Sequence, residues 1–245
     1  METVNSPEMG TPAWLAVVFK TPPVRANKGQ SKHTQYHQKI VPAMNRMMGA
    51  QGRTEACALL ALEYSQKLGL IRQFKEQPFK TLEAEFGSEI YPDFLAVRPS
   101  GQILVIEIKT ERFLTHSKQQ TLEHNRERFE AFRMEYLVWT DKKPLNHPVR
   151  HHLINMNRFA GEDIPQELIQ RLESHVTKHK ALNLTALFEA GFTLDVIYSA
   201  AWAGKVFFPI VEAFSANTKI TPWRQDHLEE LFFGSENSST GWWKS

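Results

Sequence analysis

Cysteine is almost absent from this 245-residue chain, and its scarcity rules out two classes of site. The single Cys57 cannot form an internal disulfide, and it cannot supply the several thiolates of a zinc cluster. Long apolar runs are missing too, and the first residues lack the apolar segment of a secretory signal. We therefore expect a soluble cytoplasmic protein that neither crosses nor binds a membrane.

Charge of one sign is also scarce, because the formal net charge is only +2. That value does not by itself indicate a nucleic-acid partner. The distribution says more, since the first 50 residues carry six basic and two acidic side chains. This distribution of charge fits a basic arm that contacts phosphate groups about as well as it fits a solvated tail. We predict that residues 1–30 form an extended N-terminal arm, which packs locally or only on a partner.

The most informative stretch is Tyr91–Lys109, which reads YPDFLAVRPSGQILVIEIK. Two apolar runs flank Pro, Ser and Gly, and this pattern predicts a β-hairpin. If Pro99–Gly101 form the turn, Asp93 lies opposite Glu107. Because side chains alternate along a strand, Lys109 shares a face with Glu107. The other side chains of both runs are apolar, so we expect a hairpin that is buried on both faces.

Two opposed carboxylates repel each other, with Cβ atoms only about 5 Å apart, and burial makes their charged forms costlier. A divalent cation relieves this repulsion, because Mg²⁺ binds one or two carboxylates together with waters and phosphate oxygens. Lys109 could then position or deprotonate a water molecule, or stabilise charge on a phosphorane-like transition state. The alternative is a weak Glu–Lys surface pair at the end of a strand.

Helical and strand patterns surround the hairpin. They predict a helix over Arg53–Leu68 that ends at Gly69, a strand over Ile71–Phe79, a helix over Lys118–Met134 and a buried strand over Tyr136–Thr140. The resulting order is α-β-β-β-α-β, with a right-handed crossover between the last two strands. We assign this unit to residues 31–143.

The second half, residues 144–245, is predicted to be mainly helical after a linker at Lys142–Asn146. Helical patterns cover His147–Phe159, Pro165–Lys180, Leu184–Ala190 and Thr193–Ala203, and strand patterns follow at Lys205–Phe208 and Lys219–Ile220. Helices followed by a two-stranded ribbon suggest a winged helix. The last helix carries few basic residues, which favours protein docking over base readout.

Two aromatic features of this half have open readings. His147, His151 and His152 are too few and wrongly spaced for zinc, so we expect solvated or DNA-facing imidazoles. The paired Trp242 and Trp243 would either anchor an interface or fold back onto the protein.

Pro92-Asp93 with Glu107-Ile108-Lys109 resembles the PD-(D/E)xK signature of restriction-endonuclease-like nucleases. TEACALLALEY, IRQFKEQPF, DFLAV, IEIK and EYLVWTDK further resemble the TnsA-type endonuclease subunit of heteromeric transposases, over most of the chain after residue 45. FEAGFTLDVIYSAAWAGKVFF is similar to that family's C-terminal domain. The resemblance implies an α/β fold with a restriction-endonuclease-like αβββαβ core, followed by a winged-helix-like C-terminal domain.

The resemblance also implies a site and partners. Glu55, with Glu63 as the substitute, would join Asp93, Glu107 and the carbonyl of Ile108 around Mg²⁺, for which Mn²⁺ could substitute, and Lys109 would position the water. Some members carry Gln where Glu107 stands, so Glu107 favours an intact metal site. The family cuts double-stranded DNA at the 5′ ends of a mobile element. A TnsB-like transposase acts at the 3′ ends, and a TnsC-like AAA+ ATPase connects the complex to target DNA. The alternatives are a stand-alone restriction or repair nuclease, and a non-catalytic DNA-binding adaptor.

Overall fold

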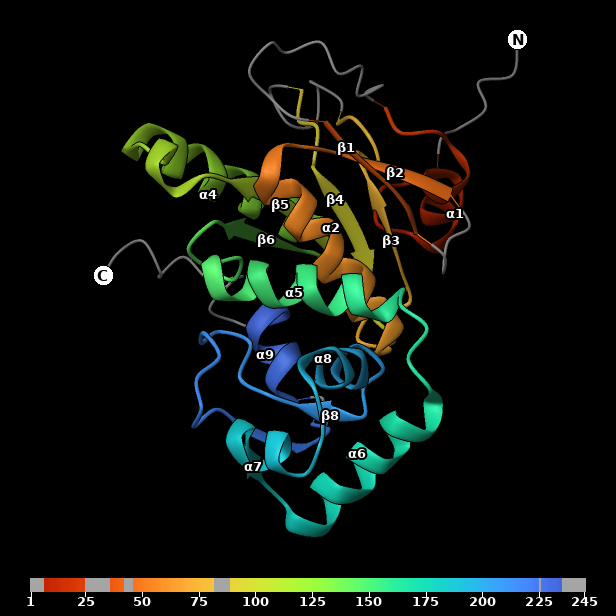
Figure 1. Cartoon of the computed structure of the whole chain (residues 1–245). Helices are drawn as coiled ribbons and strands as arrows, with labels where there is room; N and C mark the ends of the chain where they lie inside the picture. Colours follow the sequence, from red (N-terminus) through yellow and green to blue (C-terminus); the bar gives the residue numbers. More distant parts are fainter. Residues whose placement is uncertain (1–6, 25–35, 42–45, 82–88, 225, 235–245) are drawn as a thin grey trace, which may run out of the picture.

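A four-stranded mixed sheet lies at the centre of the computed structural model, which describes residues 7–24, 36–41, 46–81, 89–224 and 226–234 (Figure 1). Its strands follow the order β3 (Gln73–Glu76), β4 (Phe94–Val97), β5 (Ile103–Lys109) and β6 (Met134–Thr140). The first two pairings are antiparallel and the last, β5 with β6, is parallel. Because parallel neighbours need a long crossover, a helix must connect β5 to β6.

The hairpin β4–β5 has the predicted register. Val97 pairs with Ile103, and Arg98 donates its backbone N–H to the carbonyl of Gln102 at 2.9 Å. Gly101 closes the turn at φ +91°, a backbone conformation that side chains with a Cβ rarely adopt. The turn therefore fixes which residues of the two strands face each other.

Helices cover both faces of the sheet, which makes β5 buried on both sides as expected. Leu104 and Ile106 belong to the apolar core beneath α2, whereas Ile103 and Val105 belong to a second core beneath α4. The two helices are α2 (Gly52–Lys67) and α4 (His116–Ala131), so the predicted α-β-β-β-α-β order is confirmed. None of the helices in the described part of the chain is both long and apolar enough to cross a bilayer.

The N-terminal arm is not extended throughout, which corrects the prediction for residues 12–20. Pro12–Lys20 form helix α1, which begins after the N-cap Thr11. Val18 is buried in the core beneath α4, and the buried Lys75 of β3 donates to the carbonyl oxygens of Val18 and Thr21 at the end of the helix. A cation at the carboxyl end of a helix complements its dipole, so α1 is held by charge as well as by apolar packing.

A second hairpin, which the sequence did not indicate, precedes α2. Its strands are β1 (Tyr36–Val41) and β2 (Arg46–Gln51), and they pair antiparallel. Met48 and Ala50 are buried, and the chain turns directly into α2 at Gly52, whose φ is +83°. Both strands are rich in polar residues and lack a regular alternation of apolar and polar side chains, so their sequences alone do not indicate strands.

The C-terminal half contains the four predicted helices and a small antiparallel sheet. The helices are α5 (His147–Ala160), α6 (Gln166–His179), α7 (Leu184–Glu189) and α8 (Leu194–Trp202). The sheet has the order β7 (Leu182–Asn183), β9 (Lys219–Pro222) and β8 (Val206–Phe207). It has three strands rather than the predicted two, because the two-residue β7 is too short to detect. Helix α9 (Asp226–Phe233) was also missed, and Trp242 and Trp243 lie outside the described residues.

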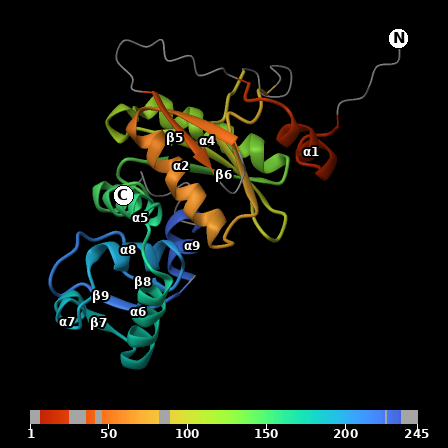
Figure 2. The ribbon, with the colours of Figure 1, turned by 45° about the vertical axis from the view of Figure 1, so that its right-hand side comes forward.

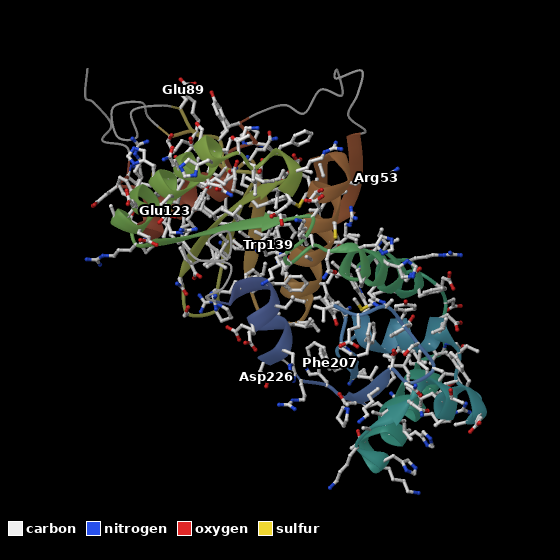
Figure 3. The ribbon with its side chains drawn as sticks, turned by 90° about the vertical axis from the view of Figure 1, so that its left-hand side faces the viewer. Arg53, Glu89, Glu123, Trp139, Phe207 and Asp226 are labelled. Carbon is white, nitrogen blue, oxygen red and sulfur yellow. The ribbon has the colours of Figure 1, made fainter. Side chains whose placement is uncertain are left out.

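The two halves share one apolar core and pack against each other through α5, α8 and α9 (Figures 1 and 2). Tyr64 of α2 donates its hydroxyl to the carbonyl of Ala201 at 2.8 Å, and its ring stacks on Trp202. Trp139 of β6, labelled in Figure 3, donates its indole N–H to the backbone carbonyl of Phe232 of α9 at 3.0 Å. The predicted linker, Lys142–Asn146, connects β6 to α5 as a turn, and Leu145 within it is fully buried.

His152 is a core residue of this contact region, which corrects the expectation of a solvated imidazole. Its Nε2 lies 2.7 Å from the carbonyl of Glu212 and its Nδ1 lies 3.0 Å from the hydroxyl of Tyr198. Nε2–H therefore donates to the carbonyl, and Nδ1 accepts from the hydroxyl. Burial lowers the pKa of His152, and the neighbouring His151 lowers it further. A charged His152 would have lost water without gaining a carboxylate.

We expect His152 to make stability depend on pH. Because its pKa is lower in the folded than in the unfolded chain, the unfolded chain binds more protons below about pH 6.5. The free energy of unfolding should therefore fall, by at most about 1.4 kcal/mol, between about pH 7.5 and about pH 5.5. Denaturation of His152→Gln should show a smaller fall. His116→Gln, at an exposed site of another helix, is the matched control, and an equal fall in all three proteins would contradict the prediction.

Candidate active site

The hairpin brings Asp93 and Glu107 together at one edge of the sheet, as predicted. The pairing of Phe94 with Ile106 continues by one residue to place Asp93 opposite Glu107. Asp93 accepts a hydrogen bond at Oδ2 from the backbone N–H of Ile108 at 2.7 Å. Its own carbonyl accepts from Gln77 at 2.8 Å, which ties it to the end of β3. Asp93 is thus fixed from both sides, its carboxylate by the N–H of Ile108 in β5 and its backbone carbonyl by the N–H of Gln77 after β3.

Lys109 lies on the same face and contacts the acid pair. Its Nζ donates to Oε1 of Glu107, two residues earlier in β5. About a third of the Lys109 side chain is exposed, compared with 12% of the Glu107 side chain. The ammonium therefore lies between the buried acids and solvent.

Glu55 approaches this pair from the first turn of α2. Its negative charge raises the pKa of both Asp93 and Lys109, so it belongs to the same electrostatic cluster. Glu63 is eight residues further along the helix, or about 12 Å along its axis, and its side chain is buried. Of the two acids proposed for this role, Glu55 is the one whose charge acts on Asp93.

The acid pair is costly to keep ionised. Burial raises the pKa of Asp93 well above its usual range, and the charge of Glu107 raises it further. Lys109 and the N–H of Ile108 lower it, but they do not outweigh the first two effects. Burial and the charge of Glu107 thus both disfavour the ionised form of the Asp93 carboxyl, and additional positive charge would favour that form.

Lys109 shows the opposite balance. Burial alone would lower the pKa of its ammonium, but the charges of Glu107 and Asp93 raise it above its usual value. Lys109 is therefore a cation at neutral pH rather than a free base. This favours a role in orienting a water or stabilising negative charge over a role in removing a proton.

The residues fit a divalent cation as a two-carboxylate site. Within the described part of the chain, no three His, Cys, Asp or Glu side chains are gathered closely enough to hold a metal ion, so Glu55 is near the pair without completing a triad. Glu107 nevertheless has a buried Oε2 with no hydrogen-bond partner. A buried acceptor without a donor is costly, and Mg²⁺ needs only one or two carboxylates when waters and phosphate oxygens complete its shell. The role of the Ile108 carbonyl stays a prediction.

Tyr136 is a neighbour of the site that the sequence did not reveal. It pairs with Val105 across β5 and β6, and it is buried beneath α4. Burial and then the charge of Glu107 raise the pKa of its hydroxyl well above the usual value. Only the alternation of β6 could have placed Tyr136 on the face of Glu107, and the sequence offers no separate signal.

Glu111 and Asp141 lie at the same edge, just past the ends of β5 and β6. Asp141 accepts the backbone N–H of Glu111 at 2.7 Å. Both acids therefore lie at the same end of the sheet as the central cluster, without joining it in a single group of metal-ligating side chains among the described residues. No protein-family model and no curated protein matches this chain.

Asp93→Asn should stabilise the metal-free protein, because the amide relieves the repulsion with Glu107 and still accepts from Ile108. We expect the Tm in a chelator to rise by about 2–4 °C, corresponding to roughly 1 kcal/mol. Added Mg²⁺ should raise the Tm of the wild type by mass action but not that of the variant. Asp163→Asn, at an exposed loop position, is the control for the charge change. A lower Tm for Asp93→Asn in the chelator would show that the two carboxylates do not oppose folding.

Proposed function

We propose that this chain is a Mg²⁺-dependent DNA endonuclease, and that it serves as the TnsA-like subunit of a transposition complex. The observation that carries the proposal is the hairpin register. It sets Asp93 opposite Glu107, places Lys109 on the same face, and leaves a Glu107 oxygen buried without a donor. A structural ion pair needs only one of the two acids.

The element order supports the nuclease assignment. The sequence resemblance implies a restriction-endonuclease-like αβββαβ core, and α2, β3, β4, β5, α4 and β6 follow that order with a parallel final pair. Asp93, directly before β4, and Glu107, in β5, lie at the same end of two adjacent inner strands of that sheet. Motif and topology are separate observations that agree.

The C-terminal half supports a docking role. Its order α6, β7, α7, α8, β8, β9, with the sheet order β7-β9-β8, is that expected of a winged helix. Winged helices read DNA through the second helix of the turn, here α8. In this chain Val196–Trp202 of α8 are all buried, and they pack on α5 and Tyr64. Helix α8 thus has little free surface for a DNA groove, which favours a protein partner such as the AAA+ ATPase.

The chemistry divides between the residues as follows. Asp93 and Glu107, assisted by Glu55 and the Ile108 carbonyl, would hold Mg²⁺ or Mn²⁺. When bound, the ion supplies Lewis-acid stabilisation of the phosphoryl oxygens. The Lys109 ammonium orients the attacking water and stabilises charge that develops on the phosphate. Ile108 holds Asp93 in place through its N–H, so the acid keeps its orientation as charge moves.

A non-catalytic adaptor is the second candidate, and one observation favours it. The Lys109 ammonium already contacts Glu107 and compensates part of the charge of the two acids, as a bound metal ion would. In such a protein the fold and its DNA-binding surface would persist without turnover. Calorimetric titration with Mg²⁺ and Mn²⁺ separates the two, because an adaptor should show no binding that depends on Asp93.

Asp93→Ala and Glu107→Gln should each reduce cleavage of DNA carrying the element ends by at least about 100-fold, since each removes charge stabilisation of the transition state. Lys109→Ala should have an effect of similar size. Cleavage is measured with Mg²⁺ on the chain alone and together with a TnsB-like transposase. Full activity of the chain alone would favour a stand-alone nuclease.

Lys142→Ala is the matched control for Lys109→Ala. Lys142 lies at the same end of the sheet, but its side chain is largely exposed, and among the residues that the structure describes its ion pair is with Glu111, at 3.8 Å. Circular dichroism verifies that each variant is folded. An Asp93→Ala protein that still cuts at the wild-type rate would reject the assignment.

A further inference from the structure

A cavity of about 490 Å³ lies between helices α2 and α5, outside the carboxylate cluster. One stripe of each helix lines it: Arg53, Cys57 and Leu60 belong to α2, and His147, Arg150 and His151 belong to α5. These spacings of three and four residues place each set on a single helix face. The cavity is therefore built by two facing helices rather than by a loop.

The lining is cationic and contains no carboxylate. In the part of the chain that the structure describes, neither Arg53 nor Arg150 forms an ion pair. The Nε of Arg150 is buried and has no hydrogen-bond partner. Burial raises the pKa of the Cys57 thiol to about 12, and the nearby Arg150 lowers it only in part. The thiol is thus neutral, and the floor of the cavity supplies no negative charge to balance the guanidinium groups.

An unpaired buried guanidinium donor calls for an anionic acceptor. Guanidinium groups match phosphate oxygens in geometry and charge, and Arg is the residue most often used for that purpose. The rings of His147 and His151 lie nearly parallel, with centroids 6.4 Å apart, and add further donors at the rim. Inorganic phosphate alone would leave the apolar wall of Leu60 and its neighbours uncovered. A phosphate joined to a sugar would cover both parts.

Position connects the cavity to the proposed chemistry. Arg53 and Glu55 lie in the first turn of α2, about 3 Å apart along the helix axis. Arg53 lines the cavity together with residues of α5, whereas the charge of Glu55 acts on Asp93. A DNA strand whose scissile phosphate lies at the carboxylates would therefore pass the start of α2 and reach the cavity.

We propose that this cavity binds a phosphodiester group of the DNA strand next to the cleavage site, with the phosphate on Arg53 and Arg150 and the sugar on the apolar wall. The inference rests on the proposed nuclease function and adds to it a site that holds the sugar–phosphate backbone of the DNA. A phosphate contact fixes register without reading sequence. The cavity would thus position the strand, whereas any choice of sequence would come from elsewhere.

The test measures binding of the full-length chain to a fluorescent DNA duplex by anisotropy, in a chelator, so that no cleavage occurs. Arg53→Gln and Arg150→Gln should each weaken binding about three- to tenfold on every sequence, and reduce the slope of log K against log salt by about 1. Arg72→Gln is the matched control, because Arg72 is exposed beyond the other end of α2. It should bind like the wild type. Arg53 is also exposed, so Arg53→Gln tests the site without a risk to folding.

The outcomes separate this inference from the proposed function. Wild-type binding and cleavage combined with unchanged affinity and slope in Arg53→Gln and Arg150→Gln would overturn the cavity alone. Absence of DNA binding by the wild type would overturn both. Competition by inorganic phosphate and by a deoxynucleoside monophosphate distinguishes a strand site from a small-molecule site. Tight binding of the monophosphate without binding of the duplex would overturn the strand assignment.

Discussion

The opposition of Asp93 and Glu107 across one hairpin is the constraint on which the site depends. Their register is set at the far end of the strands, where Gly101 closes the turn, so the acids are held together by backbone pairing and not by attraction. The chain compensates with Lys109 and with the N–H of Ile108, yet burial and mutual charge still raise the pKa of Asp93. A pair of acids whose charge is compensated only in part, and which a sheet holds in place, is typical of functional sites.

The hairpin and the αβββαβ order could be predicted because local signals and global fold agree there. Turn residues, alternation and two-sided burial of β5 all indicate one register, and a single slip would have turned Glu107 to the other face. The same register brings Asp93, Glu107 and Lys109 together, whereas Glu55 of α2 was expected beside them only from the family resemblance. The proximity of Tyr136 to Glu107 depends on a parallel pairing formed only after α4 crosses the sheet, which no local pattern encodes.

Other features escaped because their stability comes from tertiary contacts. Helix α1 depends on Lys75, more than fifty residues away in sequence, and on the core beneath α4. His152 looks like a surface histidine beside His151 and Arg150, but the hydroxyl of Tyr198 and the carbonyl of Glu212 satisfy it inside the protein. The two-residue strand β7 and helix α9 are likewise defined by what they pack against. In each case the partner, and not the local sequence, decides the structure.

The shared core between the two halves has an evolutionary consequence. Tyr64 and Trp139 donate hydrogen bonds to backbone carbonyls of Ala201 and Phe232, and a turn with a fully buried Leu145 replaces a flexible connection. Modules joined by loose tethers can be shuffled between genes, because neither depends on the surface of the other. This chain could not exchange its halves in that way. A new C-terminal half would need the same acceptors and the same apolar surface, so the two parts must diversify together.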